Sequence, residues 1–166
     1  MWKRILFTIL AALASILLPA CSVTPAPQSE TRSMTDDVGR TISAPIHPTR
    51  IVSLTYGTDE ILTSLLPSAR IAAYSKYAGD DGISFLTKDE VAKVGQRVDM
   101  EPEHILSLAP DLVIASTSTP MQTVEVLTHS GIPVYVSAIP TTVEEMKEKV
   151  RGVAKAVHEE EKGEAL

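Results

Sequence analysis

Cysteine is almost absent from this sequence of 166 residues, in which Cys21 is the only one. A disulfide within one chain is therefore excluded, and the fold must rely on its apolar core. The four histidines lie far apart, and no two of them are four residues apart. A transition-metal site usually needs two or more histidine or cysteine ligands at one point. We therefore expect no metal site and four ordinary surface histidines, His47, His104, His129 and His158.

The motifs of common catalytic sites are missing as well. No Gly-x-Gly-x-x-Gly follows a strand pattern and no Gly-x-x-x-x-Gly-Lys-Ser/Thr occurs, which excludes the usual dinucleotide and phosphate loops. Ser53 lacks the Gly-x-Ser-x-Gly turn of a hydrolase nucleophile, and the adjacent Asp80 and Asp81 are typical of a turn. We predict a binding protein without a cofactor. A small exported hydrolase is the alternative, and it would need a nucleophile with its base or a metal cluster.

The amino terminus is typical of an exported lipoprotein. Lys3-Arg4 precedes an apolar stretch over residues 5–18, which is too short to span a bilayer comfortably and has signal-peptide proportions. Leu18-Pro19-Ala20-Cys21 resembles a bacterial lipobox, in which the cysteine is lipidated and becomes the first mature residue. A free thiol beside an ordinary cleavage site is the alternative. We expect a signal peptide over residues 1–20 and a membrane anchor on Cys21, with the protein in the cell envelope, facing the periplasm or the exterior.

Removal of that peptide would take the formal net charge from −6 to −8. An acidic chain argues against nucleic acid as a partner. Residues 21–35 are rich in Ser, Thr and Pro and lack apolar periodicity, which predicts a flexible tether. We expect residues 36–166 to form one domain and the protein to be a monomer. The domain would begin with a hairpin or extended segment at residues 36–48, around Gly39-Arg40.

From residue 50 onward, short apolar runs alternate with helical patterns. The predicted strands cover residues 50–54, 71–74, 112–115 and 132–136. The predicted helices begin near residues 58, 87, 102, 119 and 142. This alternation predicts an α/β fold of βαβ units, with a mainly parallel sheet flanked by helices on both faces. The run Leu112-Val113-Ile114 is apolar throughout, as an interior strand buried on both sides should be.

Several helix starts carry side chains that suit amino-terminal caps. Thr58 would cap the first helix, and three pairs have the spacing of a capping box: Thr87/Glu90, Thr119/Gln122 and Thr142/Glu145. On the last helix, apolar residues recur at helical spacing and predict a buried face. They are Val143, Met146, Val150, Val153, Ala154 and Val157. Glu145 and Lys149 would form an i,i+4 pair on the opposite, exposed face.

Ligands of open parallel sheets usually bind beyond the carboxyl ends of the strands. Here those ends lead into four loops, which we expect to form one polar and aromatic rim: 55–57, 75–77, 116–118 and 138–140. Tyrosines at or just past strand ends could pack against a planar or bulky ligand, whereas Tyr135, in mid-strand, belongs in the core. The predicted ligand-binding residues are Tyr56, Tyr74, Tyr77, Arg97, Met100, Ser116 and Thr117. For Arg97 and Met100 the alternative is a solvated arginine and a gap-filling methionine.

One segment has a specific spacing, Glu103-x-Ile105-Leu106-x-Leu108-x-Pro110-Asp111-Leu112-Val113-Ile114. Weaker marks surround it in order: Asp37-x-Gly39-Arg40, Pro48-x-Arg50-Ile51-Val52-Ser53-Leu54, Asp59-Glu60-Ile61-Leu62, Val94-Gly95 and Gly131-Ile132-Pro133-Val134. Together they resemble the amino-terminal lobe of the iron-complex and cobalamin binding proteins of ABC importers. The resemblance covers roughly residues 36–166.

This resemblance implies a two-lobed α/β protein whose lobes are joined by one long helix and hold the ligand between them. The ligand would be a ferric siderophore, haem or a corrinoid, and the closed complex would dock on an ABC permease in the membrane. Family members use a glutamate on each lobe to meet permease arginines, and Glu103 matches the amino-lobe glutamate. Simple compensation of the helix dipole by Glu103 is compatible with that role.

The family pattern also includes a second lobe of comparable size, whereas the sequence stops about where the linker helix would begin. We therefore expect one lobe of a truncated form, with weakened ligand binding, because tight binding requires most of the ligand surface to be buried. Two interpretations remain. The chain is the substrate-binding component of an importer, or it is a lobe without ligand that only docks on the permease or has no function.

Overall fold

The computed structural model describes residues 30–166. The signal peptide expected over residues 1–20, the lipidation of Cys21 and the tether up to residue 29 lie outside this range. Residues 31–35, which we also assigned to the tether, form strand β1 (Thr31–Thr35), paired antiparallel with β2 (Thr41–Pro45). The domain therefore begins earlier than expected, because Met34 of this polar segment is buried in the core.

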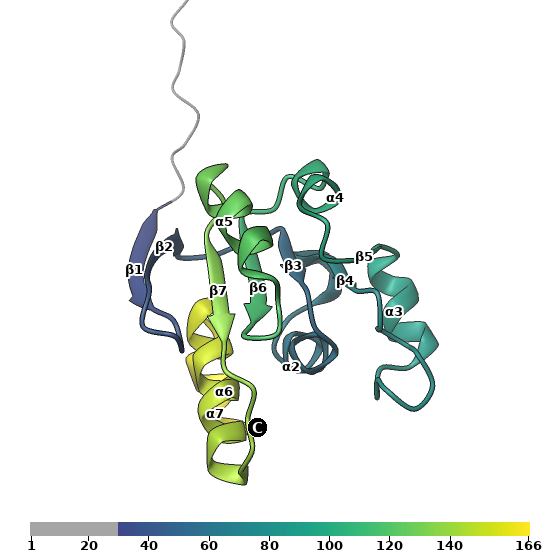
Figure 1. The fold of residues 1–166 in the computed structure, drawn as a ribbon. Helices are drawn as coiled ribbons and strands as arrows, with labels where there is room; N and C mark the ends of the chain where they lie inside the picture. The colour runs from purple at the N-terminus through teal and green to yellow at the C-terminus, as the bar shows by residue number, and fades with distance from the viewer. Residues whose placement is uncertain (1–29) are drawn as a thin grey trace, which may run out of the picture.

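Five parallel strands form the central sheet, in the order β5-β4-β3-β6-β7 (Figure 1). They are β3 (Ile51–Ser53), β4 (Ile71–Ser75), β5 (Arg97–Val98), β6 (Leu112–Ser116) and β7 (Val134–Ser137). Four of them are the predicted strands. The fifth, β5, has two residues, too few to show a period in the sequence. All five residues of β6 are buried, as expected for an interior strand.

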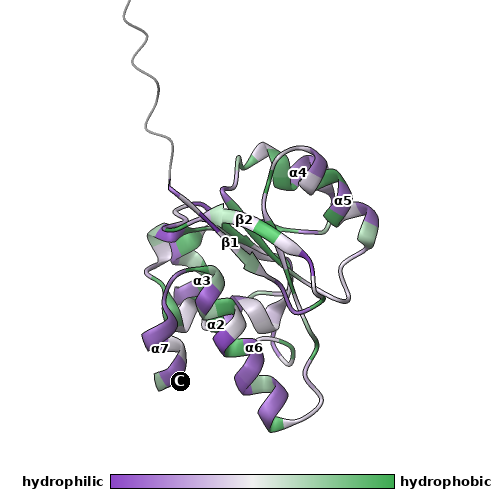
Figure 2. Cartoon of the chain, turned by 90° about the vertical axis from the view of Figure 1, so that its left-hand side faces the viewer, coloured by the Kyte–Doolittle hydropathy of each residue, from purple (hydrophilic) through white to green (hydrophobic). Residues whose placement is uncertain are grey.

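Helices cover both faces of the sheet, which confirms the predicted α/β architecture (Figure 2). One face carries α4 (Pro102–Ser107) and α5 (Met121–His129), whose buried side chains pack with Val52 and Val113. The opposite core includes Ile51 and Ile114. It contains side chains of α2 (Tyr56–Leu65) and α6 (Val143–Ala156), with α3 (Lys88–Val94) packed against it. A 3-10 turn, η1 (Ser68–Arg70), and a short helix, α7 (Glu160–Ala165), complete the chain. Between residues 30 and 166, no helix has the length and apolarity of a membrane span.

Two of the predicted caps are present. Thr87 and Glu90 form a full capping box at α3, with the Thr87 hydroxyl accepting from the Glu90 N–H and the Glu90 carboxylate accepting from the Thr87 N–H. Thr142 caps α6 by accepting from the Glu145 N–H. The Glu145 carboxylate binds the N–H and hydroxyl of Thr141 instead, so this box is shifted by one residue.

The other two predicted caps are wrong. The first helix, α2, begins at Tyr56, so Thr55 occupies the cap position and Thr58 lies inside the first turn. In α5 the cap position belongs to Pro120, and the Thr119 hydroxyl accepts from the Ser116 N–H. The hydroxyls of Thr58 and Thr119 instead form hydrogen bonds within the turns between strand and helix, where the chain reverses in a few residues.

The predicted faces of the last helix are also partly wrong. Lys149 is only 7 % exposed, whereas Val143 is 73 % exposed and Met146 47 %. The reason is the placement of α6, whose first turns extend past the carboxyl ends of the strands, where the sheet no longer covers them (Figure 1). Of the apolar residues of this segment, Val153, Ala154, Ala156 and Val157 are the ones that lie fully in the core.

Residues of the turn around Asp37-x-Gly39-Arg40 bind the β1–β2 hairpin to the edge of the sheet. The buried Asp36 carboxylate accepts two hydrogen bonds from the Arg40 guanidinium, which also donates to the carbonyl of Val134 in β7. Asp37 accepts from the Tyr135 hydroxyl and from the Ala138 N–H. Tyr135 is therefore a core residue, as expected, with its hydroxyl bound to the hairpin turn.

Candidate ligand-binding site

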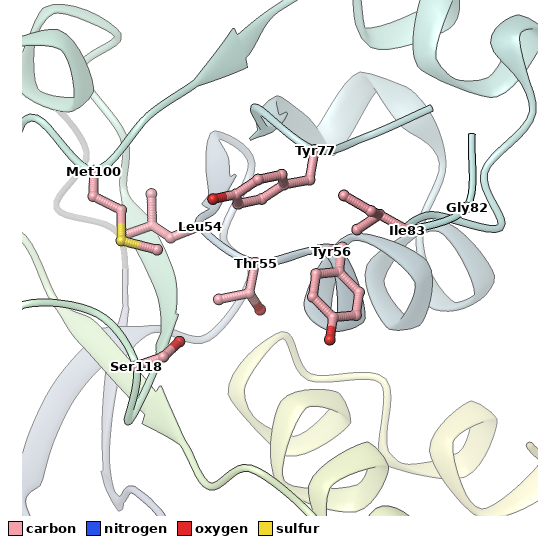
Figure 3. A pocket seen from close by; sticks show the side chains of 8 residues that line it. All are labelled: Leu54, Thr55, Tyr56, Tyr77, Gly82, Ile83, Met100 and Ser118. Carbon is pink, nitrogen blue, oxygen red and sulfur yellow. The ribbon is translucent and has the colours of Figure 1, made fainter. Parts of the chain in front are cut away.

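A cavity of about 680 Å³ opens beyond the carboxyl ends of β3 and β4 (Figure 3). We call it the rim pocket. Its lining residues come from four segments that are distant in sequence. They are Leu54, Thr55, Tyr56, Tyr77, Gly82, Ile83, Met100 and Ser118. This is the edge of the sheet at which ligands of open parallel sheets usually bind.

Each lining segment follows the end of a strand. Thr55 and Tyr56 connect β3 to α2, and Tyr77 follows β4. Met100 lies between β5 and α4, and Ser118 follows β6. In Figure 3 the Tyr77 hydroxyl points toward Leu54 and Met100. Because the strands are parallel, their carboxyl ends bring these loops to one edge.

Three of the predicted binding residues share the rim pocket: Tyr56, Tyr77 and Met100. Tyr56 is 49 % exposed, so its ring is available to a ligand. The loop after β6 contributes Ser118 to the lining. Ser116 is buried and its hydroxyl bonds that of Ser118 at 2.8 Å, while Thr117 is exposed beside them.

Tyr74 and Arg97 do not reach the pocket. Tyr74 is 1 % exposed and its hydroxyl bonds that of Thr63 at 2.8 Å, because strand β4 continues to Ser75 and turns Tyr74 into the core. Burial raises the pKa of the Tyr74 hydroxyl, so it stays protonated. The Arg97 guanidinium donates to the carbonyl of Ala78 and borders a separate hollow beside α3.

The fourth expected loop, 138–140, borders a second cavity of about 570 Å³. Its lining is mostly charged: Asp37, Ala138, Ile139, Thr141, Glu145, Glu148 and Lys149. Burial lowers the pKa of Lys149, whereas the charges of Asp37 and Glu60 oppose that shift. The four loops therefore form two hollows rather than one rim.

Two neighbouring carboxylates of α2 hold the wall of the rim pocket. The Asp59 carboxylate accepts from the Ser75 N–H at 3.0 Å and from the Ser75 hydroxyl at 2.6 Å. Glu60 accepts from the Phe85 N–H at 2.9 Å. These bonds hold the segment from Ser75 to Phe85 at both of its ends, and Tyr77 and Ile83 lie between them. The sequence does not reveal these roles, because Ser75 and Phe85, the partners of the two carboxylates, lie outside the helix.

The rim pocket is apolar with hydroxyl groups at its edge. Among the described residues that line it, none carries a charge. Two phenols, a thioether and two aliphatic side chains can bury a partly apolar ligand, and the hydroxyls of Thr55 and Ser118 can orient it. Ile83 was not predicted, since it lies in a turn segment without periodicity. Over residues 30–166, no three His, Cys, Asp or Glu side chains are placed to hold a metal ion.

Glu103 lies in the first turn of α4 and is exposed. No ion pair joins it to another residue of the described chain. Its neighbour Glu101 occupies the cap position of the helix without a side-chain cap bond. The Glu103 carboxylate is therefore accessible to a cation from outside.

The family model for periplasmic binding proteins matches residues 51–166. The putative ABC transporter substrate-binding lipoprotein YhfQ of Bacillus subtilis (strain 168) is 33% identical over 121 residues, which are 70% of this chain and 37% of that protein. The chain thus spans little more than a third of this relative.

Solved structures share the fold. A variant of the haem-binding protein HmuT superposes with a TM-score of 0.68 at 21% identity, over 84% of this chain and 43% of that one. SirA of Staphylococcus aureus, complexed with staphyloferrin B, gives a TM-score of 0.62 at 24% identity, over 81% and 45% of the two chains.

Proposed function

Because this chain belongs to the periplasmic binding protein family, we propose that it is a ligand-binding lobe of the substrate-binding component of an ABC importer. The matched relative YhfQ carries that description. The family is one of binding proteins, in agreement with the expectation of a protein that does no catalysis.

The proposed ligand is a metal chelate: a ferric siderophore, haem or a corrinoid. The observation that carries this proposal is the rim pocket, where Tyr56, Tyr77 and Met100 converge beyond the strand ends. Such a lining suits a bulky ligand with apolar faces, because aromatic rings supply large contact areas at low entropic cost. The names of two similar structures, a haem-binding protein and a staphyloferrin B complex, support the same ligand class.

Equilibrium dialysis tests this proposal directly. The chain is dialysed against haemin, ferric staphyloferrin B and cyanocobalamin separately, and the retained chelate is measured by its absorbance. We expect one of them to be retained and the double variant Tyr56→Ala/Tyr77→Ala to bind at least about tenfold more weakly, since each ring contributes on the order of 1 kcal/mol. Phe85→Ala is the matched control, because Phe85 is 91 % exposed and does not line the pocket. Retention of none of the three, or equal binding by the double variant, would contradict the proposal.

We also propose that Glu103 docks the chain on the membrane permease. Its exposure and its position at a helix amino terminus leave the carboxylate free to pair with an arginine of the partner. An arginine–carboxylate pair of this kind recognises the partner by geometry as well as by charge.

The remaining proposals concern residues outside the described range. We propose that residues 1–20 are a signal peptide, that Cys21 is lipidated and that the protein is held on the outer side of a membrane. The name of YhfQ, a lipoprotein, supports this assignment. Cys21→Ser should release the protein from the membrane fraction into the soluble fraction, and unchanged membrane association would contradict it.

A further inference from the structure

A buried lysine without a partner lies at the amino end of α2. Lys149 of α6 is only 7 % exposed, yet no ion pair joins its ammonium to another described residue. Helices α2 and α6 pack together, and a Cβ atom built on Gly57 would lie 3.4 Å from the Lys149 nitrogen. The ammonium is therefore aimed at the first turn of α2. A buried charge without a partner is unfavourable, so this position calls for an anion from outside.

The first turn of α2 offers donors rather than acceptors to this ammonium. The N–H groups of Thr58 and Asp59 share the Thr55 carbonyl, and the cap position supplies no side-chain bond. Over residues 30–166, the N–H groups of Tyr56 and Gly57 have no hydrogen-bond acceptor. The helix has ten residues, and its dipole adds partial positive charge at these donors. A positive side chain and a positive helix end thus face each other, an arrangement that an anion between them would stabilise.

The carboxylates of the protein around Lys149 do not fill this place. Asp37 and Glu60 favour the charged form of Lys149 through their own charges, but neither lies within ion-pair distance of it. Asp37 already accepts bonds from two other donors, and Glu60 accepts from a backbone N–H. Glu145 is bonded to the turn before α6, and Glu148 is exposed. The nearby charges therefore keep the ammonium protonated and leave it free to bind a ligand.

We propose that Lys149 and the first turn of α2 bind a carboxylate arm of the ligand whose body lies in the rim pocket. This inference rests on the proposed function, since it concerns the same ligand. Tyr56 lines the rim pocket and Lys149 lines the second cavity, so the amino end of α2 lies between the two hollows. A chelate with free carboxylates, such as haem with its two propionates, would use both hollows. Cyanocobalamin carries amides in place of carboxylates and would gain no ion pair.

Sodium acetate tests the carboxylate site without any chelate. The amide signal of Gly57 is followed by ¹H–¹⁵N NMR as acetate is added to about 200 mM, a range that suits the weak affinity of so small a ligand. Sodium chloride at equal ionic strength is the reference. We expect a saturable shift in the wild type and none in Lys149→Met. Lys147→Met removes a lysine from the same helix, where its ammonium pairs with Glu144 at the surface, and this matched control should keep the shift.

No acetate-dependent shift in the wild type, or an equal shift in Lys149→Met, would overturn the proposal. A second readout is dialysis against haemin and haemin dimethyl ester, which has the same ring and iron but no free carboxylate. We expect the wild type to bind haemin at least about tenfold more tightly than the ester, and Lys149→Met to lose this preference. Equal binding of the two compounds by the wild type would also overturn the proposal. If neither is retained, only the proposed function fails for haem, and the acetate titration still decides the site.

Discussion

Asp111 and Arg50 hold the starts of two neighbouring strands together. The Asp111 carboxylate accepts from the Arg50 N–H at 2.9 Å and from the Thr49 N–H at 2.7 Å. In return, the Arg50 guanidinium donates to the carbonyls of Leu108 and Ala109. Ala109 has a φ of 46°, a left-handed conformation that the turn before Pro110 requires. The two sequence motifs around Arg50 and Asp111 therefore form one structural unit, which holds β3 beside β6.

Replacement of Asp111 should weaken the fold without changing the rim pocket. Asp111→Ala removes three hydrogen bonds, two of them accepted from the backbone N–H groups of the residues just before β3. We expect the free energy of unfolding, measured in urea, to fall by about 2 kcal/mol. Asp81→Ala, in an exposed turn, is the control and should stay within about 0.5 kcal/mol of the wild type. A loss no greater than that of the control would contradict the role of Asp111.

Gly152 on α6 makes room for the Tyr135 hydroxyl. A Cβ atom there would come 2.3 Å from the hydroxyl oxygen and 3.0 Å from a carboxylate oxygen of Asp37. We expect Gly152→Ala to lower the free energy of unfolding by about 2–3 kcal/mol, because the core must shift.

The matching double variant separates this clash from helix propensity. In Gly152→Ala/Tyr135→Phe the hydroxyl is gone, so the combined loss should be smaller than the sum of the two single losses. Lys155→Ala, an exposed change on the same helix, provides the baseline. Strict additivity of the two substitutions would show that the clash does not occur.

Asp59 should make the stability of the fold depend on pH in an unusual direction. Its pKa is raised from 3.8 to about 6 in the fold, so between pH 4 and pH 6 the folded state binds more protons than the unfolded state. The contribution of Asp59 therefore lowers the free energy of unfolding as pH rises through that window. Asp59→Asn removes this effect and should be more stable than the wild type at pH 7, by on the order of 2 kcal/mol.

The difference between the two proteins, measured in urea at each pH, isolates Asp59 from other carboxylates. Glu90 and Glu145, for example, have lowered pKa values through bonds from Thr87 and Thr141, and they shift stability in the opposite sense. The advantage of the variant should vanish near pH 4. A constant difference from pH 4 to pH 7 would refute the assigned titration.

Glu103→Ala should separate docking from binding. We expect the variant to keep its affinity for the chelate in dialysis, since Glu103 does not line the rim pocket. Uptake of the chelate by cells that depend on this protein should fall by at least about tenfold, because the pair with the permease arginine is lost. Glu101→Ala is the matched control on the same helix. Weaker ligand binding by the Glu103 variant would sink the docking assignment.

The sheet and most of its helices could be predicted from the sequence because their signals are local. The apolar run of β6 indicates burial on both sides without knowledge of its neighbours. The pair Thr87/Glu90 marks the start of a helix by its spacing alone. β5 could not be predicted in this way, since two residues contain no period.

Residues at the ends of elements were harder to predict. Tyr74 and Tyr77 both stand near the end of β4, and a boundary one residue later decides which of them enters the core. Lys149 has the spacing of an exposed residue, yet it is buried because α6 packs beside α2, where the Lys149 ammonium lies close to Gly57. The partners of Asp59 depend on how α2 lies against β4, a tertiary relationship that no periodicity in the sequence reports.

The central claim is that a metal chelate binds in the rim pocket, and the methionine methyl groups test it most directly. With ¹³C-labelled methionine methyls, Met100 reports on the rim pocket, while Met34 lies in the core and Met121 and Met146 are exposed elsewhere. On titration with haemin, ferric staphyloferrin B or cyanocobalamin, the account predicts that one chelate shifts or broadens the Met100 signal first and leaves the signals of Met34, Met121 and Met146 unchanged. A chelate that binds while the Met100 signal stays unperturbed, or one that perturbs only Met121 or Met146, would contradict it.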